Sequence, residues 1–303
     1  MPPLLLQTIQ RDSAISFPML GDFTIDPPAY FTIFGIDVYF YGVIIGLGFI
    51  LAMVYCARHA KGFGLKKDDV YDLMLWLIPF SIIGARLYYV LFELDRYIRD
   101  PAKIFALRDG GLAIYGGIIA GILVIILLSK HKKVPPLAFL DLVVFGLLIG
   151  QIIGRWGNFM NREAFGAPTD VFCRMGLTTP DGSTIYVHPT FLYESLWNLA
   201  SFIILSIFVK KGLRKYDGQC VLLYFLFYGL GRGWIEGLRT DSLYIPGTPI
   251  RVSQALSLLL AAAALIILIV NSRRPHPPEK LFVNRVQAKE PAAPDPDNIR
   301  EVL

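Results

Sequence analysis

The chain has 303 residues, of which 54% are hydrophobic and only 17% are charged. A soluble protein of this length would carry about 25% charged residues, so the composition excludes an ordinary soluble domain. The net charge is +5, but the basic residues gather in short loops between apolar stretches. That pattern indicates membrane topology rather than a nucleic-acid surface, and we expect no nucleic-acid partner.

Apolar stretches long enough to cross a bilayer, which takes about 20 residues, recur along the chain. They predict an all-α, polytopic membrane bundle of seven transmembrane helices. The predicted spans are 38–57, 70–92, 111–129, 137–156, 189–209, 219–238 and 252–270.

Three regions follow from these spans. Residues 1–37 form an N-terminal arm of irregular or short extended structure, punctuated by Asp26-Pro27-Pro28. Residues 38–272 form a transmembrane domain that includes an extramembrane loop over 157–188. The proline and charge content of residues 273–303 predicts a disordered tail.

The orientation follows from the basic loops. Lysine and arginine gather after the first, third, fifth and seventh spans, which places the N-terminus and the 157–188 loop outside and the tail in the cytoplasm. The loop after the second span argues against this orientation, but the other loops outweigh it. The basic residues of that loop are Arg96, Arg99, Lys103 and Arg108.

The most informative segment, residues 154–166, reads Gly-Arg-Trp-Gly-Asn-Phe-Met-Asn-Arg-Glu-Ala-Phe-Gly and closes the fourth span. An arginine near hydrocarbon costs roughly 2.5–3.5 kcal/mol, so Arg155 is a functional candidate. If the helix continues, Arg155 and Asn158 share a face, Asn161 trails to its side, and Glu163 lies on the following turn. A lone arginine would be read as snorkelling to the interface, but two amides and a carboxylate beside it favour a site.

Further polar side chains are predicted at the same outer depth. On the sixth span they follow one helical stripe, at i, i+4, i+8 and i+11. These are Tyr228, Arg232, Glu236 and Arg239. The others are Tyr41, Arg86, Tyr115 and Glu194, with His188 as the nearest histidine.

Each of these residues also has a purely structural interpretation. Tyr41 and Tyr115 fit an aromatic belt, Glu194 fits a helix cap, and the acid and base on the sixth span fit an ion pair. Their convergence argues for a site. Arginine binds phosphate bidentately, and carboxylates bind hydroxyls, so the set suits an anionic phospholipid with a hydroxylated headgroup.

Other chemistries have no motif in the sequence. No histidine–carboxylate cluster has metal-ligand spacing, and no phosphate-binding loop or serine elbow is present. The three cysteines form no disulfide pattern. We therefore expect neither a metal nor another cofactor.

Residues 154–166 closely resemble the signature of the prolipoprotein diacylglyceryl transferase family, Gly-Arg-x-Gly-Asn-Phe-x-Asn-x-Glu followed by Gly. The resemblance extends over most of the chain. It includes residues 25–27, 41–42, 84–87, 109–111, 188–194 and 228–239.

The resemblance implies a multi-pass enzyme of the bacterial inner membrane, with its active site near the outer leaflet. Such an enzyme moves the diacylglyceryl group of phosphatidylglycerol onto the lipobox cysteine in the signal peptide of a prolipoprotein. The product is a thioether, glycerol phosphate is released, and the reaction is the first step of lipoprotein maturation.

The resemblance also implies that seven of the polar residues line the site, namely Arg155, Asn158, Asn161, Glu163, Arg232, Glu236 and Arg239. We assign catalytic roles to Arg155, Arg239, Glu163 and Tyr115. Substrate binding is assigned to Asn158, Asn161, Arg232, Glu236, Tyr41, Arg86, His188 and Glu194.

One position departs from the family. Many members carry histidine before the Gly-Gly pair of the third span, where this chain has Tyr115. Either Tyr115 relays a proton, or the position is not an obligatory base. A phenol is a poor base at neutral pH, which favours the second interpretation.

Two other classes of function remain open. A transporter or flippase for an anionic lipid would need polar residues on both sides of the midplane, or broken helices, and an internal repeat would support it. The sequence displays none of these features. A purely structural scaffold leaves the clustered outer charges unexplained.

Overall fold

The computed structural model describes residues 13–21, 23–107 and 110–289, and these residues are mostly helical. The chain divides into two compact units. Unit 1 comprises Met1–Tyr55, Val143–Arg214 and Gln219–Arg274, and unit 2 comprises Cys56–Leu142, Lys215–Gly218 and Pro275–Leu303.

Each predicted span coincides with a long helix to within a few residues. The long helices are α2 (Phe40–His59), α3 (Lys67–Phe92), α5 (Ile114–Lys132), α6 (Pro136–Met160), α7 (Thr190–Lys210), α8 (Gln219–Leu238) and α9 (Val252–Ser272). Within the described residues, six of them are long and apolar enough to cross a membrane. Helix α8 falls outside that group, because Arg232 and Glu236 lie within it. The protein is therefore a polytopic helical membrane protein.

Several short helices connect or follow these elements. They are η1 (Pro18–Leu20), η2 (Ala60–Phe63), α4 (Leu94–Arg99), η3 (Pro101–Phe105), η5 (Pro278–Lys280) and α10 (Phe282–Gln287).

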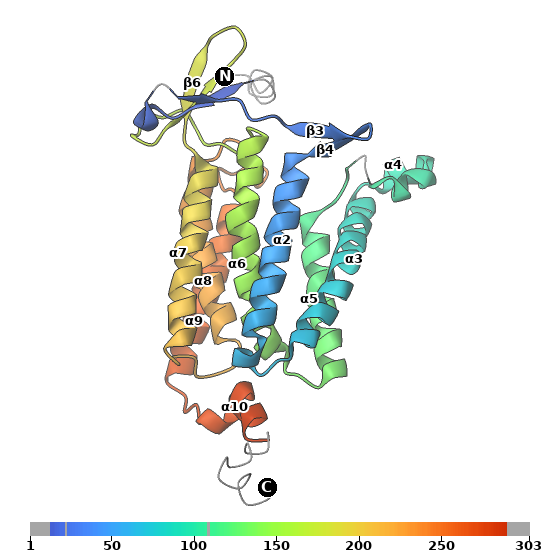
Figure 1. Cartoon of the computed structure of the whole chain (residues 1–303), viewed down its shortest axis with the longest axis vertical. Coiled ribbons are helices and arrows are strands. Elements are labelled where there is room, and N and C mark those ends of the chain that lie inside the picture. The colour runs from blue at the N-terminus through green and yellow to red at the C-terminus, as the bar shows by residue number, and fades with distance from the viewer. Residues whose placement is uncertain (1–12, 22, 108–109, 290–303) are drawn as a thin grey trace, which may run out of the picture. The chain divides into compact units, whose positions relative to one another are not determined.

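In unit 1, α8 packs along both α7 and α9, and Figure 1 shows α6, α7, α8 and α9 side by side. Gly229 on α8 lies so close to the backbone of Ser257 on α9 that a β-carbon would collide with it. Close backbone approach at a small residue is a common way to pack membrane helices. The indole of Trp197 on α7 donates to the carbonyl of Phe227 on α8 at 2.8 Å.

The all-α prediction missed two small antiparallel sheets, both in unit 1. One has the strand order β2-β1-β5-β6. Its strands are β1 (Ala14–Ser16), β2 (Thr24–Ile25), β5 (Met175–Thr178) and β6 (Thr184–Val187). The other pairs β3 (Tyr30–Ile33) with β4 (Ile36–Tyr39). These strands have at most four residues, which is too short for alternation to stand out in a sequence.

The turn between β5 and β6 did carry a sequence signal that we did not use. Pro180-Asp181-Gly182 combines three turn-forming residues, and Gly182 has a φ of 85°. Hydrogen bonds from the hydroxyls of Thr179 and Ser183 lower the pKa of Asp181 to about 2. The turn is therefore held by an ionised carboxylate at neutral pH.

A hydrophobic cluster lies against this sheet. Its buried members are Ile15, Phe165, Met175, Leu177, Val187 and Phe191. Phe165 comes from the segment that follows α6, so the cluster fixes that segment against the sheet.

The tail differs from the predicted disorder up to residue 289. In unit 2, Leu281 and Val283 are buried, and the N–H of Phe282 donates to the Asp217 carboxylate at 3.2 Å. The apolar side chains in and next to α10 become buried when this part of the tail folds, although proline and charged residues dominate the composition of the tail. The rest of the predicted tail, 290–303, lies outside the described residues.

Candidate active site

The site begins where α6 ends. The helix continues past the predicted boundary to Met160, and Nη1 of Arg155 donates to Oδ1 of Asn158 at 3.1 Å, one turn along the same face. The predicted shared helix face of Arg155 and Asn158 is confirmed. Beyond Met160 the chain turns, because Arg162 and Ala164 adopt positive φ angles of 52° and 57°.

Glu163 therefore occupies a turn rather than the next helical turn, which corrects the sequence-based expectation. Its backbone N–H donates to the carbonyl of Asn158 at 3.0 Å. The side-chain amides of Asn158 and Asn161 donate to Oε1 of Glu163 at 2.8 Å and 3.4 Å. The two predicted asparagines thus orient this carboxylate.

Tyr41, near the start of α2, lies beside Arg155 and Glu163 at the end of α6. A β-carbon at Gly157 would lie 2.7 Å from the Tyr41 ring, so the glycine gives the ring room to lie against α6. The phenol also interacts electrostatically with Glu163 and Arg155. The structure brings this predicted residue to the α6 end of the site.

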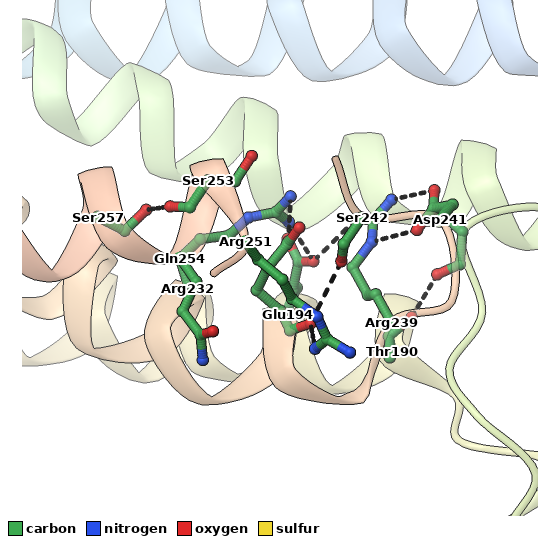
Figure 2. A network of polar contacts seen from close by, with 12 residues as sticks. Thr190, Glu194, Arg232, Arg239, Asp241, Ser242, Arg251, Ser253, Gln254 and Ser257 are labelled. Atoms are coloured by element: carbon green, nitrogen blue, oxygen red, sulfur yellow. Dashed lines mark hydrogen bonds and ion pairs between the residues drawn. The ribbon is translucent and has the colours of Figure 1, made fainter. Parts of the chain in front are cut away.

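Glu194 on α7 is the centre of the charged cluster. Its Oε2 is paired with Arg155 of α6, while Oε1 lies 2.9 Å from Nη1 of Arg232 on α8 and 3.5 Å from Nη1 of Arg239. Only 7% of the Glu194 side chain is exposed. Figure 2 shows Glu194, Arg232 and Arg239 turned toward one another. Three arginines thus share one buried carboxylate.

Two of these arginines have a second acidic partner. Arg232 pairs with Glu236 at 2.6 Å, one helical turn further along α8. Arg239 donates from Nε and Nη2 to both oxygens of Asp241, at 2.8 Å and 2.7 Å. The sequence analysis missed Asp241, although an acid two residues after a predicted site arginine was a usable signal.

Residues at the N-terminal end of α9 bind the backbone of α8 beside the arginine cluster. Arg251 donates to the carbonyl of Glu236, and Gln254 donates to the carbonyl of Gly233 at 2.6 Å. Both appear in Figure 2 beside the arginine cluster. These bonds fix the stretch of α8 that carries Arg232 and Glu236.

Through backbone hydrogen bonds to Gly166 and Ala167, His188 holds the segment that follows the turn after α6. Its backbone accepts from Gly166 at 2.9 Å and donates to Ala167 at 3.1 Å, and its Nδ1 lies 3.3 Å from the hydroxyl of Tyr193. Partial burial lowers the pKa of the His188 side chain, so the ring is neutral at pH 7. The predicted substrate-binding role of His188 stays a prediction.

Arg86 and Tyr115 belong to unit 2. The guanidinium of Arg86 lies over the Tyr97 ring at 5.3 Å, and the residue as a whole is only 5% exposed. It donates to five backbone carbonyls, those of Lys103, Ile104, Ala106, Gly110 and Gly111. Arginine has five N–H donors, so in this structure the side chain binds the backbone of segments 103–106 and 110–111.

Tyr115 lies in the first turn of α5 and is 44% exposed. Its ring centroid is 6.4 Å from that of Tyr88 on α3. The predicted catalytic role of Tyr115 stays a prediction, as does the substrate-binding role of Arg86.

Chemically, the cluster in unit 1 is suited to a phosphate. Guanidinium groups form similar bidentate, charge-assisted hydrogen bonds with carboxylates and phosphates. An anion that entered beside Arg155, Arg232 and Arg239 would thus compete with Glu194 for the same donors. The carboxylate of Glu163, set by its two asparagines, offers an acceptor for hydroxyl groups.

Comparison with known proteins agrees with this chemistry. Residues 28–270 match the family model described as prolipoprotein diacylglyceryl transferase. A phosphatidylglycerol–prolipoprotein diacylglyceryl transferase of Enterococcus faecalis is 45% identical over 266 residues, covering 86% of this chain and 94% of the relative. Proteins of the same name from Finegoldia magna and Clostridioides difficile are each 44% identical, covering 76% of this chain and 90% and 89% of the relatives. The chain therefore belongs to the prolipoprotein diacylglyceryl transferase family.

Proposed function

We propose that this protein transfers the diacylglyceryl group of phosphatidylglycerol to the lipobox cysteine of prolipoproteins. The cysteine thiol loses its proton to water, and the thiolate sulfur attacks the carbon of the diacylglyceryl group that bears the phosphate. A carbon–sulfur bond forms, and the bond from that carbon to the phosphate oxygen breaks. Glycerol phosphate leaves with the electron pair. The observation that carries the proposal is the convergence of Arg155, Arg232 and Arg239 on the single carboxylate of Glu194.

Arg155 and Arg239 hold the phosphate in this mechanism. Negative charge grows on the leaving phosphate as the carbon–oxygen bond breaks, and fixed donors aimed at that charge lower the barrier. Arg232, tied to Glu236 at 2.6 Å, keeps the other two guanidiniums apart and oriented. Asp241 fixes Arg239 through two oxygens.

Glu163 and its asparagines bind the hydroxyls of the glycerol headgroup. Asn158 links the two halves of the site, because its carbonyl-type oxygen accepts from Arg155 while its amide nitrogen donates to Glu163. Asn158 therefore keeps Arg155 and Glu163 close together, so that one headgroup can contact the phosphate-binding arginine and the hydroxyl-binding carboxylate at the same time.

The nearby arginines also favour the thiolate form of the substrate cysteine, since positive charge lowers a thiol pKa. This effect reduces the need for a dedicated base. Tyr115 would then be dispensable for deprotonation.

Two contacts between segments that flank the helices support seven membrane crossings. Ala167 donates to the carbonyl of Leu238 at 2.7 Å, so the chain between them crosses an even number of times. Because α7 crosses once, α8 must cross back despite its charges. Likewise β1 pairs with β5, and the four helices α2, α3, α5 and α6 lie between these strands.

The site then lies on the same side as the N-terminal arm and the 157–188 segment. Basic residues follow α2, α5, α7 and α9, which favours the cytoplasm for the opposite side. We place the protein in the bacterial inner membrane, with its active site at the outer leaflet.

The first experiment combines the purified full-length protein, phosphatidylglycerol micelles and a lipobox peptide, scored by mass spectrometry for a diacylglyceryl adduct. The wild-type protein is expected to form the adduct. Arg155→Ala and Arg155→Lys are each expected to lose on the order of 100-fold in turnover, because lysine keeps the charge but lacks the planar fork. Tyr115→Phe is expected to stay within about threefold of wild type.

Membrane insertion and thermal midpoint, measured for each variant, serve as controls. Near-normal turnover of Arg155→Lys would reject the bidentate role. No adduct from folded wild-type protein that still binds phosphatidylglycerol would replace the transferase proposal with lipid transport.

A further inference from the structure

The residue next to Glu163 has an unusual backbone conformation. Arg162 has a φ of 52°, in the left-handed region that glycine adopts without steric cost. Its side chain is nonetheless large and only 3% exposed. A long, charged residue at a position suited to glycine, and almost fully buried, indicates that the side chain itself has a task.

The contacts of Arg162 reveal what it joins. Its Nε donates to the carbonyl of Ser13 at 2.7 Å, immediately before β1. Its Nη1 donates to the carbonyl of Met160 at 3.0 Å, at the last residue of α6. Its Nη2 pairs with Asp26, immediately after β2. One guanidinium therefore ties the N-terminal arm at two points to the end of the helix that carries Arg155.

The other neighbour of Glu163 is fixed as well. The hydroxyl of Thr190 on α7 donates to the carbonyl of Ala164, and Phe165 is buried in the hydrophobic cluster beneath the sheet. The turn that presents Glu163 is thus held on one side by Arg162 and on the other by α7 and the sheet.

We propose that Arg162 is a positioning residue for Glu163, and that the N-terminal arm is part of the support of the active site. Arg162 acts through its guanidinium contacts, which tie the turn to the arm and to the end of α6. The turn is thereby placed so that the Glu163 carboxylate meets the amides of Asn158 and Asn161. The inference rests on the proposed function, in which Glu163 binds the headgroup hydroxyls of phosphatidylglycerol.

The principal test is Arg162→Gly, which removes the guanidinium but suits the backbone. Phosphatidylglycerol affinity, read from the lipid-dependent rise of the thermal midpoint, is expected to fall about tenfold. The matched control is Lys133→Gly. Lys133 is an exposed residue at the end of α5 with a φ of 55°, and its replacement should leave affinity within twofold.

A double-mutant cycle separates positioning from a general structural effect. If Arg162 acts through Glu163, then adding Arg162→Gly to Glu163→Gln should weaken lipid binding by no more than about twofold beyond Glu163→Gln alone. A merely structural role would give a full, additive tenfold loss. The cycle reads binding, so it does not depend on residual turnover.

Two milder variants keep the proposal testable if Arg162→Gly folds poorly. Arg162→Lys retains the charge without the fork and should lose about threefold in affinity. Asp26→Asn should lose less than Arg162→Lys, because the Asp26 side chain is 75% exposed and exposed ion pairs contribute little. Asp37→Asn, another exposed acid of the arm, is its control.

Equal affinities for Arg162→Gly and Lys133→Gly would overturn the proposal, and so would additivity with Glu163→Gln. Failure of the proposed function gives a different result, in which the wild-type protein binds phosphatidylglycerol but forms no diacylglyceryl adduct.

Discussion

Arg86 and Arg155 lie at comparable places in the sequence, each within the last two turns of a membrane helix, but their partners differ in kind. Arg86 on α3 donates to five backbone carbonyls. Arg155 on α6 is paired with the side-chain carboxylate of Glu194, which Arg232 and Arg239 share. A carbonyl is fixed in the backbone, whereas a carboxylate on a rotatable side chain can be exchanged for another anion.

The comparison suggests how buried arginines can be sorted in such a protein. A guanidinium whose donors all reach carbonyls shapes the chain around it. A guanidinium that shares a carboxylate with other arginines can bind a phosphate when that carboxylate moves. Burial alone does not separate the two, because Arg86 is the more buried of this pair.

The largest effect that would sharpen this comparison is expected for Glu194→Gln. Removing the shared charge leaves three arginines poorly compensated, and breaking a buried ion pair destabilises by roughly 3–5 kcal/mol. The thermal midpoint in lipid-free detergent should fall, and phosphatidylglycerol should raise it by more than in wild type, because the phosphate supplies the missing negative charge. Glu93→Gln, at an exposed acid after α3, is the control. Equal protection of Glu194→Gln and wild type by the lipid would argue against anion exchange.

A smaller effect, on stability alone, is expected for Arg86→Lys. Lysine has three donors in place of five, so at least two carbonyls lose a partner, at a cost of about 1–3 kcal/mol. Turnover per folded molecule should stay within about threefold of wild type. Arg96→Lys, which changes an exposed arginine beside Tyr97, is the control. A large loss of turnover at unchanged stability would instead support the predicted substrate-binding role of Arg86.

The smallest effect concerns His188 and pH. Burial lowers the pKa of the folded side chain below its ordinary value near 6.5, so the unfolded state binds more protons as the pH falls through that value. The thermal midpoint should therefore decrease slightly below about pH 6.5, while above it the histidine contributes no pH dependence. His188→Gln should flatten this part of the profile, and an unchanged slope in that variant would assign the dependence to other groups.

Sequence reasoning located the helices and most of the charged cluster, because both depend on side-chain patterns. Apolar runs of about 20 residues marked each span, and the helical spacing of Arg232 and Glu236 predicted their shared face, which the structure confirms with an ion pair. The signature segment likewise predicted that Arg155 and Asn158 meet.

The features it missed depend on the backbone. The left-handed conformation that ends the helix before Glu163 occurs at an arginine rather than a glycine. The sequence therefore contains no turn-forming residue at this position that would have predicted it. The carbonyls around Arg86 have no sequence signature, since every residue carries one. Strands β1 and β5 pair although about half of the chain lies between them in the sequence, and each is too short to be recognised separately.

That pairing also sets an order for assembly during synthesis. Ser13, whose carbonyl accepts from Arg162, precedes α2, α3, α5 and α6 in the chain, whereas β5 follows all four of these helices and is synthesised later. The arm is therefore synthesised without its partner strand β5, which becomes available only after these four helices have been made. Only after α6 has been made can Ser13 and Asp26 contact Arg162, so the turn that carries Glu163 reaches its final form late in biogenesis.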